Sequence, residues 1–303
     1  MFKLRTGYIV SAIATGLLLL FSFLFSLPDG KLHMYVCDVG QGDGIYIRFP
    51  DGRDMVVDGG PSDAITKCLG NHMPFWDRHI DIVAMTHPQK DHIQGLISVL
   101  TRYSVDYFMR TDVDTSTDVY ESIQKTLSER HVSTRYIVRG ERIKIGQTNL
   151  SVLWPSSAQI AKGKPSLSSS YATDQTVLGA VAGDVNEYCL VFWLRYGSFD
   201  ALLTGDADME IEDQYIGTNL ADGIVEVLKV PHHGSRTGMT KAFVDWLHPK
   251  LALISVGKNT YGHPSQEAIH LLESVGSQIH RTDKEGDIEV ISDGASWTLH
   301  KSR

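Results

Sequence analysis

The chain has 303 residues, of which 42% are hydrophobic and 21% are charged, and its formal net charge is −8. This composition is typical of a globular protein with a real core and excludes wholesale disorder. The negative charge argues against a broad basic face for nucleic acid, because phosphate binding depends on clustered Lys and Arg. It is compatible with a nuclease whose active site alone is made positive by bound metal.

An uncharged apolar segment occupies residues 7–27. A helix of this length would span about 31 Å, enough to cross the hydrocarbon core of a bilayer. Because Lys3 and Arg5 precede it, the positive-inside rule places residues 1–6 in the cytoplasm and the rest outside. A cleaved signal peptide is the alternative, but its apolar region would be shorter. The sequence predicts a single-pass cell-membrane anchor that holds residues 28–303 on the extracytoplasmic side.

The chain has three cysteines, Cys37, Cys68 and Cys189, and their spacing is not that of a metal site. Two of them, Cys37 and Cys189, lie inside apolar, strand-like runs. Buried free thiols are therefore expected.

Hydrophobic periodicity predicts strands at both ends of residues 28–303 and helices between them. The expected strands are 33–39, 44–49, 54–58, 81–85, a β pair within 142–154, four apolar runs (YCLVFWLRYG, DALLTGD, IVEVLKV and LALISVG) and a final hairpin in GDIEVISDGASWTLH. Helical spacing occurs at 92–103, 119–130, about 239–247 and about 265–275. The Ser-rich stretch 156–176 is expected to be a long surface loop. Two sheets sandwiched by helices, in one domain, account for this order.

Four of the predicted strands lead directly into loops rich in polar, ligand-type residues. In chain order these residues are His87, Asp91 and His92; Asp206; His232, His233 and Ser235; and Lys258, Asn259 and His263. Sites in layered α/β proteins are built from loops at one end of a sheet. The sequence therefore predicts that the four loops converge on one pocket.

Imidazole together with carboxylate suits Zn²⁺, Mn²⁺ or Fe²⁺ better than Ca²⁺, which prefers an all-oxygen shell. With two metals, Asp206 is the natural bridging carboxylate, since the glycine before it lets the backbone turn sharply. A metal-activated hydroxide would then attack a phosphoryl or acyl centre. Taken singly, Asp206 could be a turn residue or a helix cap, and each histidine could be an ordinary loop residue. Their shared position after strands favours a metal pocket.

Two further aspartates lie in glycine-containing loops. Asp58, in VVDGG, is predicted to lie beside the metal loop and orient a ligand from behind. Asp43, in GQGDG, could do the same or only cap a turn.

Six motifs occur in a characteristic order: CDVGQGDGIYI, VVDGG, THPQKDHIQG, LLTGDAD, LKVPHHGS and YGHPS. With them the chain resembles, over about residues 32–300, the metallo-β-lactamase-like domain of the ComEC family of DNA-uptake competence proteins, within the metallo-β-lactamase superfamily. The resemblance implies an αββα sandwich, a metal-dependent hydrolase and phosphodiester bonds in DNA as the substrate class. ComEC proteins also carry a multi-helix channel, whereas this chain has one predicted span.

The resemblance also implies a division of the site residues. A first metal site would use His87, Asp206 and Gln89. Gln89 is neutral, whereas the family has histidine or aspartate at this position, and the third histidine of the superfamily pattern has no counterpart in this chain. A second would use Asp91, His92, Asp206 and His263. The remaining residues would hold or protonate the scissile phosphate beside the catalytic Asp91: His232 or His233, Ser235, Lys258 and Asn259. A histidine of this group could act as general acid.

The sequence thus predicts a membrane-anchored phosphodiesterase or nuclease that uses one or two divalent ions, Zn²⁺ or Mn²⁺. Its expected partners are DNA or another phosphodiester outside the cytoplasm, and the lipid bilayer through residues 7–27. Two alternatives stay open: a hydrolase of small acyl substrates such as lactones or thioesters, and a metal-poor, non-catalytic domain that binds DNA or a partner. The neutral Gln89 is the feature that favours the last of these.

Overall fold

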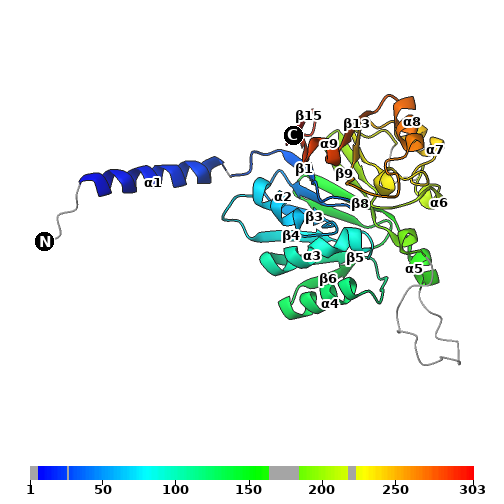
Figure 1. The fold of residues 1–303 in the computed structure, drawn as a ribbon, viewed down its shortest axis with the longest axis horizontal. Coiled ribbons are helices and arrows are strands. Elements are labelled where there is room, and N and C mark those ends of the chain that lie inside the picture. The colour runs from blue at the N-terminus through cyan, green and yellow to red at the C-terminus, as the bar shows by residue number, and fades with distance from the viewer. Residues whose placement is uncertain (1–5, 26, 164–183, 218–222) are drawn as a thin grey trace.

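The computed structural model describes residues 6–25, 27–163, 184–217 and 223–303. Over these residues, two sheets pack face to face and helices cover both outer faces (Figure 1). The first sheet has the order β15-β14-β1-β2-β3-β4-β5-β6 and the second has the order β13-β12-β11-β10-β9-β8-β7. The predicted αββα sandwich is confirmed.

The strands of the first sheet are β1 (Leu32–Val36), β2 (Ile45–Arg48), β3 (Asp54–Val57), β4 (His79–Ala84), β5 (Ser104–Arg110), β6 (Ser133–Tyr136), β14 (Ile288–Ser292) and β15 (Trp297–Lys301). Those of the second are β7 (Arg142–Ile145), β8 (Thr148–Trp154), β9 (Val191–Tyr196), β10 (Phe199–Leu203), β11 (Val227–Lys229), β12 (Leu251–Ile254) and β13 (Gln278–Arg281). The helices are α1 (Thr6–Phe25), α2 (Ala64–His72), α3 (Lys90–Arg102), α4 (Asp118–Arg130), α5 (Ser157–Gly163), α6 (Met209–Glu212), α7 (Lys241–Leu247), α8 (Gln266–Ser274) and α9 (Thr282–Glu285), with 3₁₀ turns η1 (Val185–Tyr188) and η2 (Pro231–Gly234). The predicted helices correspond to α3, α4, α7 and α8, whereas α2, β5, β6 and β13 were not anticipated.

The side chains along each strand alternate between the two faces of the sheet, and this alternation produces the layers of the fold. In β1, Leu32, Met34 and Val36 belong to the core between the two sheets, while Tyr35 packs with the helices on the outer face. This alternation follows from the two-residue period of a strand, which sends successive side chains to opposite faces. Each sheet is therefore apolar on both faces, and the helices of the outer layers cover the faces that the other sheet does not.

The Ser-rich stretch is only partly a loop. Residues 157–163 form α5, whose Ile160 is buried, so the prediction of a surface loop is wrong there. The apolar side chain of Ile160 packs against the rest of the protein, and such tertiary packing stabilises a short helix. The remainder of the stretch, 164–176, lies outside the described residues.

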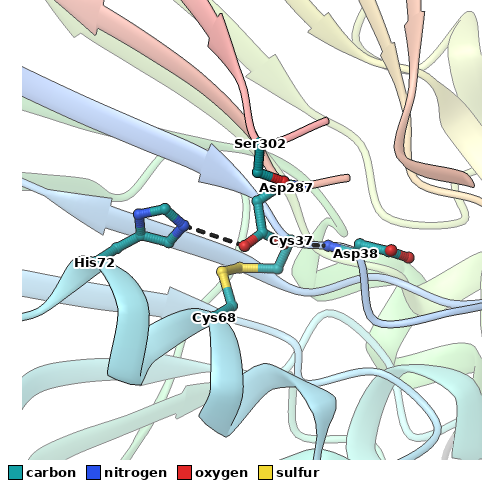
Figure 2. The surroundings of a disulfide bond; sticks show 6 residues. All are labelled: Cys37, Asp38, Cys68, His72, Asp287 and Ser302. Carbon is teal, nitrogen blue, oxygen red and sulfur yellow. Dashed lines mark hydrogen bonds and ion pairs between the residues drawn. A yellow bond between two sulfur atoms is a disulfide. The ribbon is translucent and has the colours of Figure 1, made fainter. Parts of the chain in front are cut away.

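Cys37 and Cys68 form a disulfide that joins the end of β1 to α2 (Figure 2). The prediction of free thiols is therefore wrong for these two, and confirmed for Cys189, which is free and buried. The reason is α2, which brings the two Cα atoms to 5.9 Å, within the usual range for a disulfide. Beside the bond, His72 of α2 pairs with Asp287 at 3.1 Å.

Helix α1 extends away from the sandwich (Figure 1), and residues 7–21 are exposed. In the described part of the chain, no helix combines the length and the apolar character required to cross a membrane. Anchoring through residues 7–27 stays a prediction.

Asp54, a buried carboxyl of β3, gives stability a pH dependence. Its Oδ1 accepts a hydrogen bond from the Tyr46 hydroxyl at 2.6 Å, and burial raises its pKa from 3.8 to about 7. Because the folded state holds the proton more tightly than the unfolded state, the protein should lose stability as the pH rises from about 4 to about 7. We expect Asp54→Asn to raise the free energy of unfolding by about 1–3 kcal/mol at pH 8 and by little at pH 4. Urea unfolding at both pH values measures this, and the exposed Asp63→Asn is the control. An equal effect of Asp54→Asn at the two pH values would contradict the assignment.

Candidate metal centre

The four polar loops meet at one edge of the sandwich. Strands β10, β11 and β12 are parallel neighbours, so the loops that follow them lie side by side. The loop after β4 faces them from the other sheet. The loops after β4, β11 and β12 line a hollow of about 790 Å³ whose walls include Gln89, Asp91, His232, His233, Lys258, Asn259 and His263.

Four side chains at this edge place one donor atom each within 4.8 Å of the others: Asp91, His92, Asp206 and His233. Asp206 lies at the centre of the group. Its Oδ1 is 3.2 Å from Nε2 of His92, and its Oδ2 is 3.4 Å from Nε2 of His233. Nε2 of His233 is also 3.7 Å from Oδ2 of Asp91. We call these four residues the donor group.

Several buried polar atoms of the site have no hydrogen-bond partner within the described residues. They include Nε2 of His87, His92 and His233, and Oδ1 of Asp206; all but the first lie within ion-pair distance of another member of the donor group, without the geometry of a hydrogen bond. Leaving buried polar atoms unsatisfied is costly, and native proteins rarely do so. Imidazole nitrogens and carboxylate oxygens are ligands that Zn²⁺, Mn²⁺ and Fe²⁺ accept. The donor group therefore fits a divalent transition-metal ion.

A carboxylate fixes the orientation of the His92 ring through the ring nitrogen that does not face the donor group. Its Nδ1 lies 2.8 Å from Oδ2 of Asp58, and Asp58 in turn accepts from the backbone N and the hydroxyl of Thr86 at 2.8 and 2.6 Å. This arrangement turns the other ring nitrogen of His92 toward the donor group, as carboxylates behind metal-binding histidines do. Asp58 has φ of 57°, a conformation that non-glycine residues adopt rarely and that clusters at functional sites.

His233 is oriented in a similar way. Its Nδ1 donates to the carbonyl oxygen of Ser255 at 2.9 Å and lies 3.3 Å from Oδ1 of Asp43. Burial by itself would raise the pKa of Asp43, but the ammonium of Lys229 beside it holds that pKa below its usual range. Asp43 therefore stays ionised behind His233.

Two competence-related proteins resemble this chain, one over most of its length and the other over about a third of it. The ComE operon protein 3 of Bacillus subtilis is 28% identical over 294 residues, which are 91% of this chain and 34% of that protein. Competence protein ComA of Neisseria gonorrhoeae is 31% identical over 107 residues, 35% of this chain and 16% of that protein. The chain spans about a third of the length of the curated relatives that match most of it. No family model matches.

Among solved structures, the metallo-β-lactamase fold protein YhfI of Bacillus subtilis superposes with a TM-score of 0.56. The match covers 86% of this chain and 100% of that chain, at 12% identity. The chain has the metallo-β-lactamase fold. The predicted resemblance to the metallo-β-lactamase-like domain of ComEC-type competence proteins is confirmed.

Within this metallo-β-lactamase fold, His233 rather than His263 completes the donor group. His263 lies on the wall of the hollow, with its ring centroid 5.7 Å from that of His232. Its Nδ1 is buried without a hydrogen-bond partner in the described residues. The structure thus brings the late histidine near the centre but does not group it with the other ligands.

The first site predicted from the superfamily pattern is less complete. His87 is buried, and burial lowers its pKa to about 3, so the ring is neutral and able to coordinate. Its Nδ1 lies 3.0 Å from the Thr86 hydroxyl. Gln89 lines the hollow at the start of α3. His87 belongs to none of the clusters of His, Cys, Asp and Glu donors in the described residues. One metal is therefore better supported by the geometry than two.

The residues predicted to handle the phosphate occupy different places. His232 is part-exposed, with Nδ1 2.9 Å from Oδ1 of Asp208 and Nε2 3.7 Å from Oδ2 of Asp206. Asn259 shapes its own turn, because its Oδ1 accepts from the backbone N of Tyr261, Gly262 and His263. Lys258 is exposed on the wall of the hollow. Ser235 is buried, with Oγ 3.2 Å from that of Thr237.

Three residues near the centre were missed in the sequence. Asp208 pairs with His232, Cys189 accepts from the backbone N of Asp206 at 3.2 Å, and Lys229 lies beside Asp43. Only Lys229 carries a sequence signal, since it is a charged residue inside the apolar run EVLKV.

Replacing Gln89 by aspartate tests the weaker site. A carboxylate at the start of α3 would add a charged ligand beside His87, so Gln89→Asp should raise the metal content above that of the wild type. Metal analysis of the purified protein after dialysis measures this, with Gln41→Asp, another glutamine that lines the hollow, as the matched control. Unchanged metal content and activity in Gln89→Asp would mean that the first site is not used.

Proposed function

We propose that the chain is a metal-dependent hydrolase of phosphodiester bonds that acts outside the cytoplasm, with DNA as its substrate class. The observation that carries this proposal is the donor group of Asp91, His92, Asp206 and His233, whose unsatisfied buried atoms converge beside an open hollow. One relative is named a competence protein and another a ComE operon protein. For this reason DNA is the first substrate to test.

The donor group would hold the ion. When bound, a divalent ion there supplies Lewis acidity and activates water near neutral pH. Asp58 behind His92, and the Ser255 carbonyl together with the charge of Asp43 behind His233, keep the two imidazoles turned toward it, so the ligands are organised without the metal.

The hollow offers groups for an anionic substrate. Lys90 and Lys258 lie on its wall and can attract a phosphate, which favours a phosphodiester over a neutral lactone or thioester. Both of the paired histidines line the hollow, but His233 is buried within the donor group, whereas His232 is part-exposed. We therefore assign His232, oriented by Asp208, as the general acid that protonates the leaving oxygen.

Hydrolysis assays test the reaction. The purified protein should cleave bis(p-nitrophenyl) phosphate and single- or double-stranded DNA in the presence of Mn²⁺ or Zn²⁺, and EDTA should stop it. His92→Ala should remove the activity, while His270→Ala, which replaces an exposed histidine of α8, should retain it. Cleavage of a lactone or thioester without any phosphodiester turnover would instead establish the acyl hydrolase. DNA binding without metal and without turnover would establish the non-catalytic alternative.

Two features support an anchored, extracytoplasmic location. The Cys37–Cys68 disulfide is of a kind that persists in oxidising compartments and is rare in the cytosol. Phe75 and Trp76 are 61% and 40% exposed, and they line a hollow together with Leu18 and Phe21 of α1 and with Leu27, which follows that helix. Exposed aromatic rings beside an apolar helix are typical of a membrane–water interface. Protease treatment of intact cells should digest residues 28–303 of a surface-located protein, and full protection would contradict this location.

A further inference from the structure

Lys229 is a fully buried cation behind the donor group. It ends β11, and its side chain is 0% exposed. Its ammonium pairs with the carboxylate of Asp43 and donates to the carbonyl oxygen of Gly205 at 2.9 Å. It also lies 3.9 Å from Oδ1 of Asp206.

Packing does not explain a lysine at this position. Its neighbours Leu228 and Val230 are buried in the apolar core beside α7 and α8. An apolar residue would avoid the desolvation of an ammonium, and replacing a buried ion pair by well-packed apolar residues is often neutral or stabilising. The pair of Lys229 and Asp43 therefore calls for a role other than stability.

Both partners of Lys229 act on the donor group. Asp43 lies 3.3 Å from Nδ1 of His233, on the side of the ring opposite the nitrogen that faces Asp206. Gly205 has φ of +51° and directly precedes Asp206, so its carbonyl sets the turn from which Asp206 projects. A single ammonium thus touches the supports of two of the four donor residues.

We propose that Lys229 is a positioning residue for metal binding: it holds Asp43 behind His233 and fixes the turn that presents Asp206. The inference rests on the metal centre of the proposed function and is independent of the proposed substrate. It predicts that Lys229 sets the affinity for the ion, although it does not contact the ion.

Titration calorimetry of the metal-free protein with Mn²⁺ and with Zn²⁺ tests this inference. Lys229→Met and Asp43→Asn should each weaken binding about 10–100-fold, the usual effect of losing a support behind a ligand. The double variant should bind no more weakly than Lys229→Met, because removal of Lys229 already releases Asp43. Arg110→Met is the matched control. Arg110 is another buried cation, in β5, paired with Asp114, and its loss should leave the affinity unchanged.

The outcomes separate the proposals. Absence of metal binding by the wild type would overturn the metal centre itself. Wild-type affinity in a Lys229→Met protein that keeps its near-ultraviolet circular dichroism would overturn the positioning role alone, as would losses that add in the double variant. If Lys229→Met does not fold, Asp43→Asn, which retains the lysine, decides the question, and wild-type affinity there would overturn the inference.

Discussion

Replacing Asp206 by asparagine is expected to weaken metal binding and phosphodiester hydrolysis by at least about 100-fold, since the loss of a mere support behind a ligand already costs about 10–100-fold. Asp206 is the residue that the other donors share, with its two carboxylate oxygens 3.2 and 3.4 Å from Nε2 of His92 and of His233. Asparagine keeps the shape but removes the negative charge and one acceptor oxygen. Calorimetry with Mn²⁺ gives the affinity, and hydrolysis of bis(p-nitrophenyl) phosphate gives the activity.

Asp200→Asn is the matched control for this change. Asp200 lies in β10, the strand that leads to Asp206, and is also largely buried, but it pairs with Arg195 and Trp193 instead of the donor group. Its replacement should lower stability and leave metal binding intact. If Asp206→Asn bound metal as tightly as the wild type, the donor group would not be the metal centre.

The layers of the fold could be predicted from the sequence because each strand encodes them locally. The alternation in β1 and the largely apolar sequences of β10, β11 and β12 are properties of a few adjacent residues, and burial on one or both faces follows directly. The edge strand β6 has no such signal, since its four residues are all exposed. Its place in the sheet depends on pairing with β5, which a local pattern does not encode.

The loops of the site could be predicted for the same reason, but the choice among their histidines could not. His233 joins the donor group because His232 and His233 both have positive φ, 48° and 54°, in the turn after β11. With that backbone conformation the two rings diverge, so that the ring of His233 is buried in the donor group and the ring of His232 stays part-exposed. Neither the HHG motif nor the spacing to His263 reveals it, because non-glycine residues rarely adopt this conformation.

The cysteine pairing was missed because α2 has a weak signal. Only Ile65, Cys68 and Leu69 are buried in its nine residues, which is too short a pattern to distinguish from a loop. Without that helix, nothing places Cys68 near Cys37. A contact between residues 31 apart in sequence is set by tertiary packing, and the apolar character of a cysteine alone is equally compatible with a buried thiol.

Reduction of the Cys37–Cys68 disulfide is expected to lower the free energy of unfolding by about 3.5–4 kcal/mol, the loop-closure value for a separation of 31 residues. The bond ties the end of β1, in the middle of the first sheet, to the helix that covers it, so the unfolded chain gains freedom when the bond is cut. Urea unfolding with and without dithiothreitol measures the difference. Thiol titration under denaturing conditions should find one free thiol, Cys189, before reduction and three afterwards.

The Cys37→Ala/Cys68→Ala variant is the control, since its stability should no longer respond to dithiothreitol. The donor group does not include either cysteine, so the reduced protein should keep its affinity for Mn²⁺ there while it remains folded; the freed thiols beside Asp287 are a separate set of donors. The same titration on protein taken directly from cells then bears on location, because an oxidised pair is expected outside the cytoplasm and a reduced pair inside it. Three free thiols in freshly isolated protein would contradict both the bond and the extracytoplasmic location that it supports.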